Sequence, residues 1–349
     1  MNKRLEWLDA MRGLTMILVV AYHVAQMSFG INEKTSTSLP FLMLFRMPLF
    51  FFVSGFLAYK ANFEWTWPNA LRLTWKKVKI QVLPAFLFLC IFIVLRRSDF
   101  GPAFEHSMKS PLKSGYWFTW VLLHMFIVYY LACMWQRRVG TRYRHSVIWV
   151  LFLLSLLAYE TLYLPHYFTY PQTAFFRYSS LAKTINFLPF FLFGNLAHRY
   201  WAQVQRVFDS RWFYPLLMLV AFVSCAEFFR WHTLRFEWTN LPRTAAMFSL
   251  LTLVVMFFRH YQEWFTQDKA IGRSLQYIGV RTLDIYLIHY ILLPKLPQVG
   301  VWLNTNRPNF VAEIVASFSV ALVVIAFCLL VSQMLRVSPL FRKYLFGRS

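Results

Sequence analysis

The chain has 349 residues, of which 58% are hydrophobic, 20% aromatic and only 14% charged. Soluble domains hold about 45–50% apolar and about 25% charged residues, so this composition excludes a disordered chain, a coiled coil and an ordinary cytosolic enzyme. The net charge is +22. The basic residues lie between long apolar runs, so they indicate a role in membrane topology rather than binding to nucleic acid. Because the runs are unbroken rather than alternating, they predict an all-α, polytopic integral membrane protein.

Ten apolar runs follow one another along the chain, each near the roughly 20 residues that a membrane-spanning helix needs. They cover about 8–29, 40–59, 80–96, 116–135, 146–164, 184–199, 212–229, 241–258, 279–294 and 311–335. With a cytoplasmic N-terminus, the inner segments hold 23 Lys and Arg residues and the outer loops 12, as the positive-inside rule requires. We therefore expect about ten membrane helices and two cytoplasmic termini. We expect one membrane domain over 1–349, with a helical core at about 8–335 and a short cytoplasmic tail at 336–349.

The first run carries ionisable groups, which are costly in a membrane and are therefore candidate functional residues. Asp9 and Arg12 lie at its start and His23 lies deep inside it. Eleven residues along a helix return to within about 20° of the same face, roughly 16 Å further on, so Arg12 and His23 share one stripe. This stripe suits a long ligand with an anionic head and a reactive far end. The spacing alone is equally compatible with an Arg12 that only sets the membrane topology and a His23 that only packs in the core.

The second and third runs add cations. Arg46 enters the second run from the outer side, to about the depth of His23 at 1.5 Å per residue. The alternative is a structural arginine that caps backbone carbonyls where Pro48 interrupts the helix. Lys77 and Lys79 lie at the inner mouth of the third run, where they form either a positive-inside cluster or a phosphate clamp.

The fourth and ninth runs contain the remaining polar candidates. His124 lies about two turns into the fourth run and is either a second base or a hydrogen-bonded core histidine. In the ninth run Arg281 and Asp284 are three residues apart and can pair, and His289 lies further along between two tyrosines. The sequence contains no zinc-protease, nucleotide-cradling or hydrolase-elbow motif, so we expect no metal site and no permanently bound cofactor.

Several segments occur together, in order and at characteristic spacings, from residue 4 to about 335. They are the start Leu8-Asp9-x-x-Arg12-Gly13, the Arg-x10-His spacing that ends at His23, FFFVSGF at 50–56, Tyr116-Trp117-Phe118, the stretch 190–194 and the segment from Gly279 to His289. Together they resemble the membrane-bound acyltransferase-3 family.

The resemblance implies a ten-helix membrane O-acyltransferase without an additional periplasmic domain, in the cell's inner (plasma) membrane. Such an enzyme moves an acyl group, usually acetyl, from cytoplasmic acyl-CoA to a hydroxyl of a glycan, a lipid-linked sugar or a small molecule. The family's arginine and histidine map onto Arg12 and His23. Its basic pair at the third helix maps onto Lys77 and Lys79, where lysine replaces arginine twice and loses the bidentate fork.

Acyl transfer to an alcohol needs a base to take the hydroxyl proton, and histidine is the usual choice. We therefore expect His23 to be the catalytic base, with Asp9 orienting Arg12. The residues expected to bind acyl-CoA, the co-substrate, are Arg12, Lys77, Lys79 and Arg281. The residues expected to contact the acceptor are Arg46, His124, Asp284 and His289.

Two other functions remain open from the sequence. The main alternative is a transporter or flippase of a glycan-related substrate, in which intramembrane His, Arg and Asp form the substrate or proton path. The sequence lacks the paired, broken half-repeats of many transporters. The other alternative is a non-catalytic partner in a glycan-export complex. In each case the expected partners include the lipid bilayer and a carbohydrate or lipid-linked sugar, and exclude nucleic acid.

Overall fold

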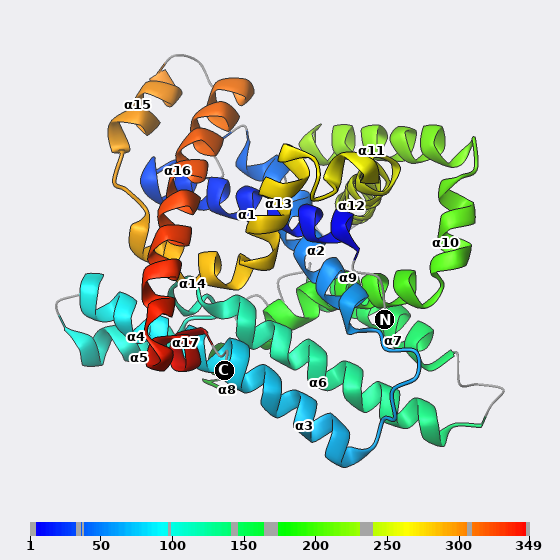
Figure 1. Ribbon diagram of the computed structural model, residues 1–349. Coiled ribbons are helices and arrows are strands. Elements are labelled where there is room, and N and C mark those ends of the chain that lie inside the picture. The colour runs from blue at the N-terminus through cyan, green and yellow to red at the C-terminus, as the bar shows by residue number, and fades with distance from the viewer. Residues whose placement is uncertain are drawn as a thin grey trace. The chain divides into compact units, whose positions relative to one another are not determined.

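The computed structural model describes residues 5–32, 36, 38–96, 99–140, 146–163, 174–230, 240–305 and 309–346 (Figure 1). The regular structure of these segments is entirely helical. The helices of the first half are α1 (Glu6–His23), η1 (Val24–Ser28), α2 (Leu39–Ala58), α3 (Trp67–Lys77), η2 (Val78–Val82), α4 (Leu83–Arg96), α5 (Phe100–Lys109), η3 (Lys113–Gly115), α6 (Trp117–Arg138), α7 (Ser146–Ala158) and η5 (Tyr159–Tyr163). Those of the second half are α8 (Ala174–Ser179), α9 (Leu181–Arg199), α10 (Trp201–Phe208), α11 (Phe213–Arg230), α12 (Asn240–His260), η6 (Gln262–Phe265), α13 (Ala270–Val280), α14 (Thr282–Leu292), α15 (Pro297–Thr305), α16 (Phe310–Val337) and α17 (Pro339–Phe346). The predicted all-α fold class is confirmed.

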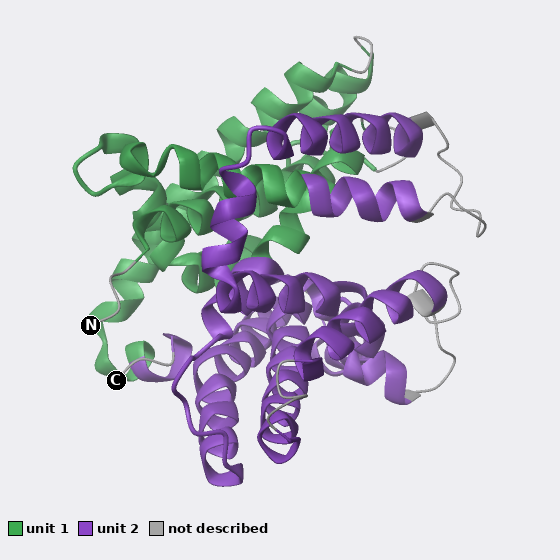
Figure 2. Cartoon of the chain, turned by 90° about the vertical axis from the view of Figure 1, so that its right-hand side faces the viewer, with its two compact units in different colours: residues 1–50, 250–342 green, residues 51–249, 343–349 purple. Residues whose placement is uncertain are grey.

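Contacts within the chain concentrate in two compact units (Figure 2). Unit 1 consists of residues 1–50 and 250–342, and unit 2 of residues 51–249 and 343–349. The helices α2, α12 and α17 each contribute residues to both units. The domain expected over the whole chain is therefore organised around two centres of packing.

Each of the ten predicted apolar runs coincides with a helix, but these helices differ in length and hydropathy. Among the described residues, six helical stretches are long and apolar enough to cross a membrane: Glu6–Ser28, Leu39–Ala58, Trp67–Arg96, Trp117–Arg138, Leu241–His260 and Phe310–Val337. The pair α10 and α11, bent by 84°, can supply a seventh, and α7 and α14 belong to shorter apolar helices. The polytopic character is confirmed, whereas the count of ten stays a prediction.

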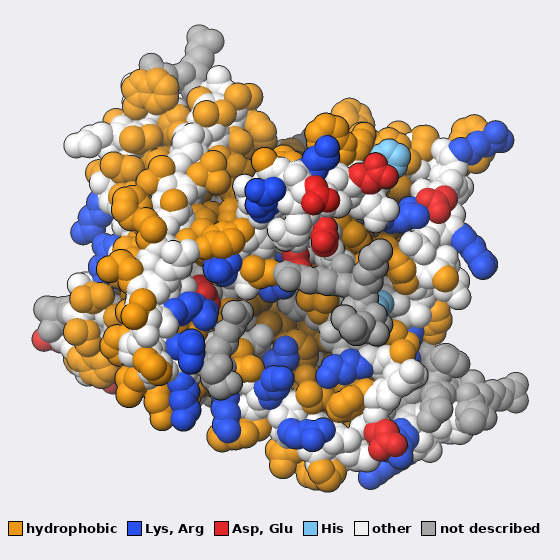
Figure 3. All heavy atoms as spheres, viewed as in Figure 1, with side chains coloured by type: hydrophobic (Ala, Val, Ile, Leu, Met, Phe, Trp, Pro, Cys, Tyr) orange, Lys and Arg blue, Asp and Glu red, His pale blue; other side chains and the backbone are white. Residues whose placement is uncertain are grey.

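Several long helices expose apolar side chains to an extent that suits lipid rather than water. Phe222 of α11 is 73% exposed and Met334 of α16 is also 73% exposed. Figure 3 shows hydrophobic side chains over much of the visible face, with Lys and Arg side chains gathered between them. Exposed apolar surface of this extent marks contact with a membrane or a partner, and the hydropathy of these helices favours the membrane.

In unit 1, α1 packs against α13 with almost no space between the two backbones. A Cβ atom at Gly13 would lie 2.0 Å from a backbone oxygen of α13, and one at Gly279 would lie 1.9 Å from the backbone oxygen of Asp9. Small residues permit such close helix crossings in membranes. The crossing fixes the first half of α1, which carries Arg12, against the helix that precedes Arg281.

Two segments expected to be connecting or terminal are helical. The segment between the third and fourth predicted runs, 97–115, contains α5 and η3, and α5 ends at Lys109. In the predicted tail at 336–349, α16 continues to Val337 and α17 follows. Phe346 of α17 is buried, with its ring centroid 6.2 Å from that of Phe88. The helices in both segments are amphipathic and short, so they form no long apolar run in the sequence.

Candidate active site

Helix α1 carries Asp9, Arg12 and His23 along one unbroken helix, as the spacing predicts. Arg12 Nη1 donates to Asp9 Oδ1 at 3.1 Å, and Arg12 Nη2 donates to Thr282 Oγ1 at 3.2 Å. The guanidinium is therefore fixed between its own helix and the first residue of α14. Such a pair also lowers the cost of holding the cation in a partly buried position.

His23 ends α1 at the point where the π-helix η1 begins. Its Nε2 atom lies 2.9 Å from the hydroxyl oxygen of Tyr290 in α14. The ring centroids of His23 and His289, also in α14, are 5.4 Å apart. Single turns of π-helix often occur at functional sites because they re-aim neighbouring side chains. Two histidines and a tyrosine from the apolar helices α1 and α14 thus form one polar cluster.

The hydrogen bonds of His289 fix its tautomer. Its Nδ1 atom lies 3.0 Å from the carbonyl oxygen of Ile285 and 2.9 Å from that of Tyr286. Because a carbonyl oxygen only accepts, Nδ1 carries the proton, and Nε2 of the neutral ring presents a lone pair. His289 is 0% exposed, and its Nε2 has no hydrogen-bond partner among the described residues.

His23 also presents a buried ring nitrogen without a partner. Its Nδ1 atom makes no hydrogen bond to any described residue. A buried polar atom without a partner is unfavourable and is expected where a substrate group or a water molecule completes the site. The His23–His289 pair therefore offers two such positions for a polar ligand.

Arg46 belongs to the same part of unit 1. Its guanidinium carbon lies 3.3 Å from the centroid of the Tyr22 ring, and Arg46 also interacts electrostatically with His23 and Tyr290. The sequence left open whether Arg46 is structural or functional. The contact with Tyr22 anchors the cation beside His23, so it contributes positive charge at the site.

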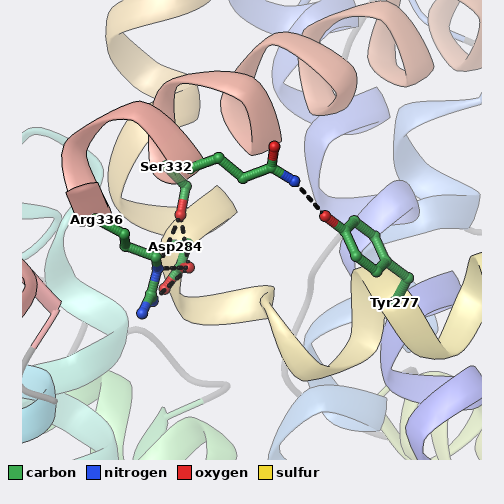
Figure 4. Close-up of polar contacts among 5 residues, drawn as sticks. Tyr277, Asp284, Ser332 and Arg336 are labelled. Atoms are coloured by element: carbon green, nitrogen blue, oxygen red, sulfur yellow. Dashed lines mark hydrogen bonds and ion pairs between the residues drawn. The ribbon is translucent and has the colours of Figure 1, made fainter.

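Asp284 lies in the first turn of α14, as expected, but its ion-pair partner is Arg336 of α16 (Figure 4). Arg336 Nη2 and Nε donate to Asp284 Oδ2 at 2.6 Å and 3.1 Å, and Ser332 Oγ donates to the same oxygen at 2.8 Å. The guanidinium of Arg281 instead lies 3.8 Å from the centroid of the Tyr277 ring. The helix break at Arg281 separates it from Asp284, so the regular three-residue spacing of one helix does not apply. In the sequence, Arg336 is one of the 23 basic residues of the inner segments, and nothing there marks it as the partner of Asp284.

Replacing Asp284 by alanine should destabilise the protein by about 3 kcal/mol, because it leaves Arg336 without its buried counter-ion. Arg336 keeps 19% of its side chain exposed, which places the effect at the lower end of the range for buried pairs. Thermal unfolding of the detergent-solubilised protein measures the change. As a control, Glu105→Gln removes one charge of an exposed ion pair with Lys109 and should leave the unfolding temperature nearly unchanged. Equal effects of the two substitutions would contradict this assignment.

The predicted phosphate clamp lies in unit 2. Lys77 ends α3 and Lys79 lies in the π-helix η2, inside one helical stretch from Trp67 to Arg96. The two lysines thus lie within a long helical stretch rather than at its start, because the polar segment before them is helical too. The Nζ atom of Lys77 lies 4.0 Å from the centroid of Phe126, and that of Lys79 lies 5.5 Å from the centroid of Trp75.

His124 also lies in unit 2 and has a hydrogen-bond partner. Its Nδ1 atom is 3.1 Å from Thr184 Oγ1. Lys113 lies in η3, just before α6, the helix that carries His124. Its Nζ atom donates to the carbonyl oxygen of Met108 at 3.0 Å and lies 5.8 Å from the Trp120 ring centroid. Burial lowers the pKa of Lys113 to about 8. This arrangement agrees with the hydrogen-bonded core histidine that the sequence left as an alternative.

A buried carboxylate in unit 1 was missed by sequence analysis. Glu313 of α16 is 4% exposed and accepts hydrogen bonds from Ser38 Oγ, at 2.6 Å, and from Ser36 Oγ. The contacts tie the segment before α2 to the start of α16. Glu313 lies near the start of the apolar run 311–335, where a carboxylate usually faces water, so its burial could not be expected from the sequence.

These features define a polytopic membrane protein with a buried His289, a partly buried His23 and flanking arginines in one compact unit. Residues 5–333, nearly the whole chain, match the family described as an acyltransferase domain. The chain therefore belongs to the acyltransferase-3 family and is a membrane acyltransferase. The comparison with curated proteins gives no match, and neither does the comparison with solved structures.

Proposed function

We propose that this acyltransferase moves an acetyl group from cytoplasmic acetyl-CoA to a hydroxyl group of a glycan, a lipid-linked sugar or a small-molecule acceptor. The observation that carries the proposal is the buried His23 Nδ1 without a hydrogen-bond partner, on the same helix as the ion-paired Arg12. His23 at the end of α1 and Arg12 nearer its start match a donor that is reactive at one end and anionic at the other.

In the proposed reaction His23 Nδ1 takes the proton of the acceptor hydroxyl while the hydroxyl oxygen attacks the thioester carbonyl carbon. The carbon–sulfur bond breaks, and the CoA thiolate leaves and takes up the proton that His23 Nδ1 has accepted, which returns the ring to its neutral form. For Nδ1 to accept, the neutral ring carries its proton on Nε2 and donates it to the Tyr290 oxygen, 2.9 Å away. Tyr290 then holds the tautomer that the base requires.

The other residues of the cluster have proposed roles in binding. The lone pair on His289 Nε2 suits a second hydroxyl of the acceptor. The charge of Arg46 suits the oxygen of the thioester carbonyl, which becomes negative as the bond to the acceptor forms. Asp284 is held by Arg336 and Ser332, so its contacts favour a positioning role over direct contact with the acceptor.

Lys77 and Lys79 are proposed to bind the anionic end of the donor. The double substitution Lys77→Ala with Lys79→Ala should weaken acyl-CoA binding about tenfold, and the difference from wild type should shrink as salt increases. The matched control is Arg72→Ala with Lys76→Ala, which removes two exposed charges from α3, in the same helical stretch Trp67–Arg96. If both double variants bind acyl-CoA equally well, the clamp assignment is wrong.

The proposed location is the plasma membrane, with both termini in the cytoplasm. The larger number of basic residues in the inner segments supports this orientation. It places the Arg12 end of α1 on the side where acyl-CoA is made.

The proposed function is tested by giving labelled acetyl-CoA to the purified protein in lipid nanodiscs together with an extract of envelope glycans and lipids. We expect label in a product from which mild alkali releases it, because oxygen esters are alkali-labile and amides are not. A transporter or a non-catalytic partner would leave all the label in acetyl-CoA, and that result would reject the proposal.

A further inference from the structure

Unit 1 contains a second group of polar contacts where α13, α14 and α16 meet. The guanidinium carbon of Arg281 lies 3.8 Å from the centroid of the Tyr277 ring. Gln333 Nε2 of α16 donates to the Tyr277 hydroxyl at 2.5 Å (Figure 4). The Tyr277 ring is thus held at one face and at its hydroxyl, while 37% of the residue remains exposed.

Helix α16 holds both parts of the broken helix α13–α14 through neighbouring residues. Ser332 and Arg336 bind Asp284 in α14, and Gln333 binds Tyr277 in α13 (Figure 4). Arg281 lies at the break itself, as the N-cap residue of α14. Its position therefore depends on three helices and is fixed before any ligand arrives.

Arg281 differs from the two other arginines of this region in its partners. Arg12 is paired with Asp9, and Arg336 is paired with Asp284. The Arg281 guanidinium has no hydrogen bond or ion pair with any residue that the structure describes. A guanidinium that lies over an aromatic ring keeps its N–H donors in its own plane, where two of them match two oxygens of a phosphate. A half-buried cation of this kind indicates an anionic ligand.

We propose that Tyr277, Arg281 and Gln333 form the subsite for the nucleotide end of acyl-CoA. Arg281 donates in-plane N–H groups to a phosphate, the exposed surface of the Tyr277 ring stacks on the adenine base, and Gln333 holds the ring in place. Stacking of a base on an aromatic ring and bidentate binding of a phosphate are each strong enough to matter for affinity. The inference rests on the proposed acyl-CoA donor and adds its nucleotide-binding residues.

A phosphate ester can come from two sources, the donor or an anionic lipid headgroup. The experiment therefore measures equilibrium binding of CoA and of pantetheine, which lacks the nucleotide, to the full-length protein in neutral phosphatidylcholine nanodiscs. A parallel arm measures retention of phosphatidylglycerol by the same variants. The variants are Arg281→Ala, Tyr277→Ala and Tyr277→Phe, and the control is Arg273→Ala, an exposed arginine of α13.

We expect Arg281→Ala to weaken CoA binding about ten- to a hundredfold and Tyr277→Ala about tenfold. Tyr277→Phe keeps the ring and should lose less than Tyr277→Ala. Pantetheine binding should stay the same in every variant, and Arg273→Ala should bind CoA within about twofold of wild type.

Three results would overturn the subsite. They are unchanged CoA affinity in Arg281→Ala, equal losses for CoA and pantetheine, and a loss confined to phosphatidylglycerol retention. Failure of the proposed chemistry looks different, because CoA then binds through Arg281 while no acyl group is transferred. A wild-type protein that does not bind CoA contradicts both proposals.

Discussion

Replacing His23 by alanine should lower the rate of acyl transfer by about 10²–10⁴-fold, the usual contribution of a general base. The affinity for acyl-CoA should remain nearly unchanged, because His23 acts on the acceptor proton and not on the anionic end of the donor. A fall in kcat without a change in donor affinity identifies an interaction that is made in the transition state. Steady-state transfer and equilibrium CoA binding, measured on the same preparation, check this result.

The controls are the other two membrane histidines, His289 and His124. His289→Ala removes the lone pair that is proposed to bind the acceptor, so it should raise the KM for the acceptor more than it lowers kcat. His124 is hydrogen-bonded to Thr184 in unit 2, so His124→Ala should have the smallest effect on transfer. If transfer collapses in His124→Ala and stays near wild type in His23→Ala, the base is in unit 2 and its assignment to His23 is wrong.

Replacing Gly279 by alanine should destabilise the protein by more than about 3 kcal/mol. The added methyl group would clash with backbone atoms, and these cannot move aside as the end of a flexible side chain can. The new Cβ atom would lie 1.9 Å from the backbone oxygen of Asp9. Helices α1 and α13 would have to separate, and this would also move Arg12 away from Thr282. The yield of monodisperse protein and its thermal unfolding temperature measure the effect.

The matched control is the same substitution at Gly101 in α5, where a Cβ atom meets nothing within 4 Å. In an open helical position alanine stabilises relative to glycine by roughly 0.5–1 kcal/mol. The two substitutions should therefore change the unfolding temperature in opposite directions. An unfolding temperature of Gly279→Ala at or above wild type would show that the α1–α13 crossing is not as close as described.

Part of the site follows from local helix geometry and could be predicted. The Arg12–His23 stripe and the Asp9–Arg12 pair depend only on spacing along one helix, and the structure contains both. The all-α class follows equally directly from the long apolar runs.

Contacts between distant helices could not be predicted in the same way. Nothing in the sequence indicates that Asp284 pairs with Arg336, because Arg281 is nearer in sequence and only the break in the helix separates them. The partner of His23 depends likewise on how α1 lies against α14. The spacing of residues in one sequence carries no information on such crossings, since they are set by packing between helices.

The central claim is that His23 accepts the acceptor proton, and chemical rescue tests it most directly. Single-turnover acyl transfer by His23→Ala, at saturating donor, is measured with and without added imidazole. We predict a rate about 10²–10⁴-fold below wild type, which rises with imidazole concentration because the small base enters the space left by the side chain. Near-wild-type transfer by His23→Ala without imidazole would contradict the account.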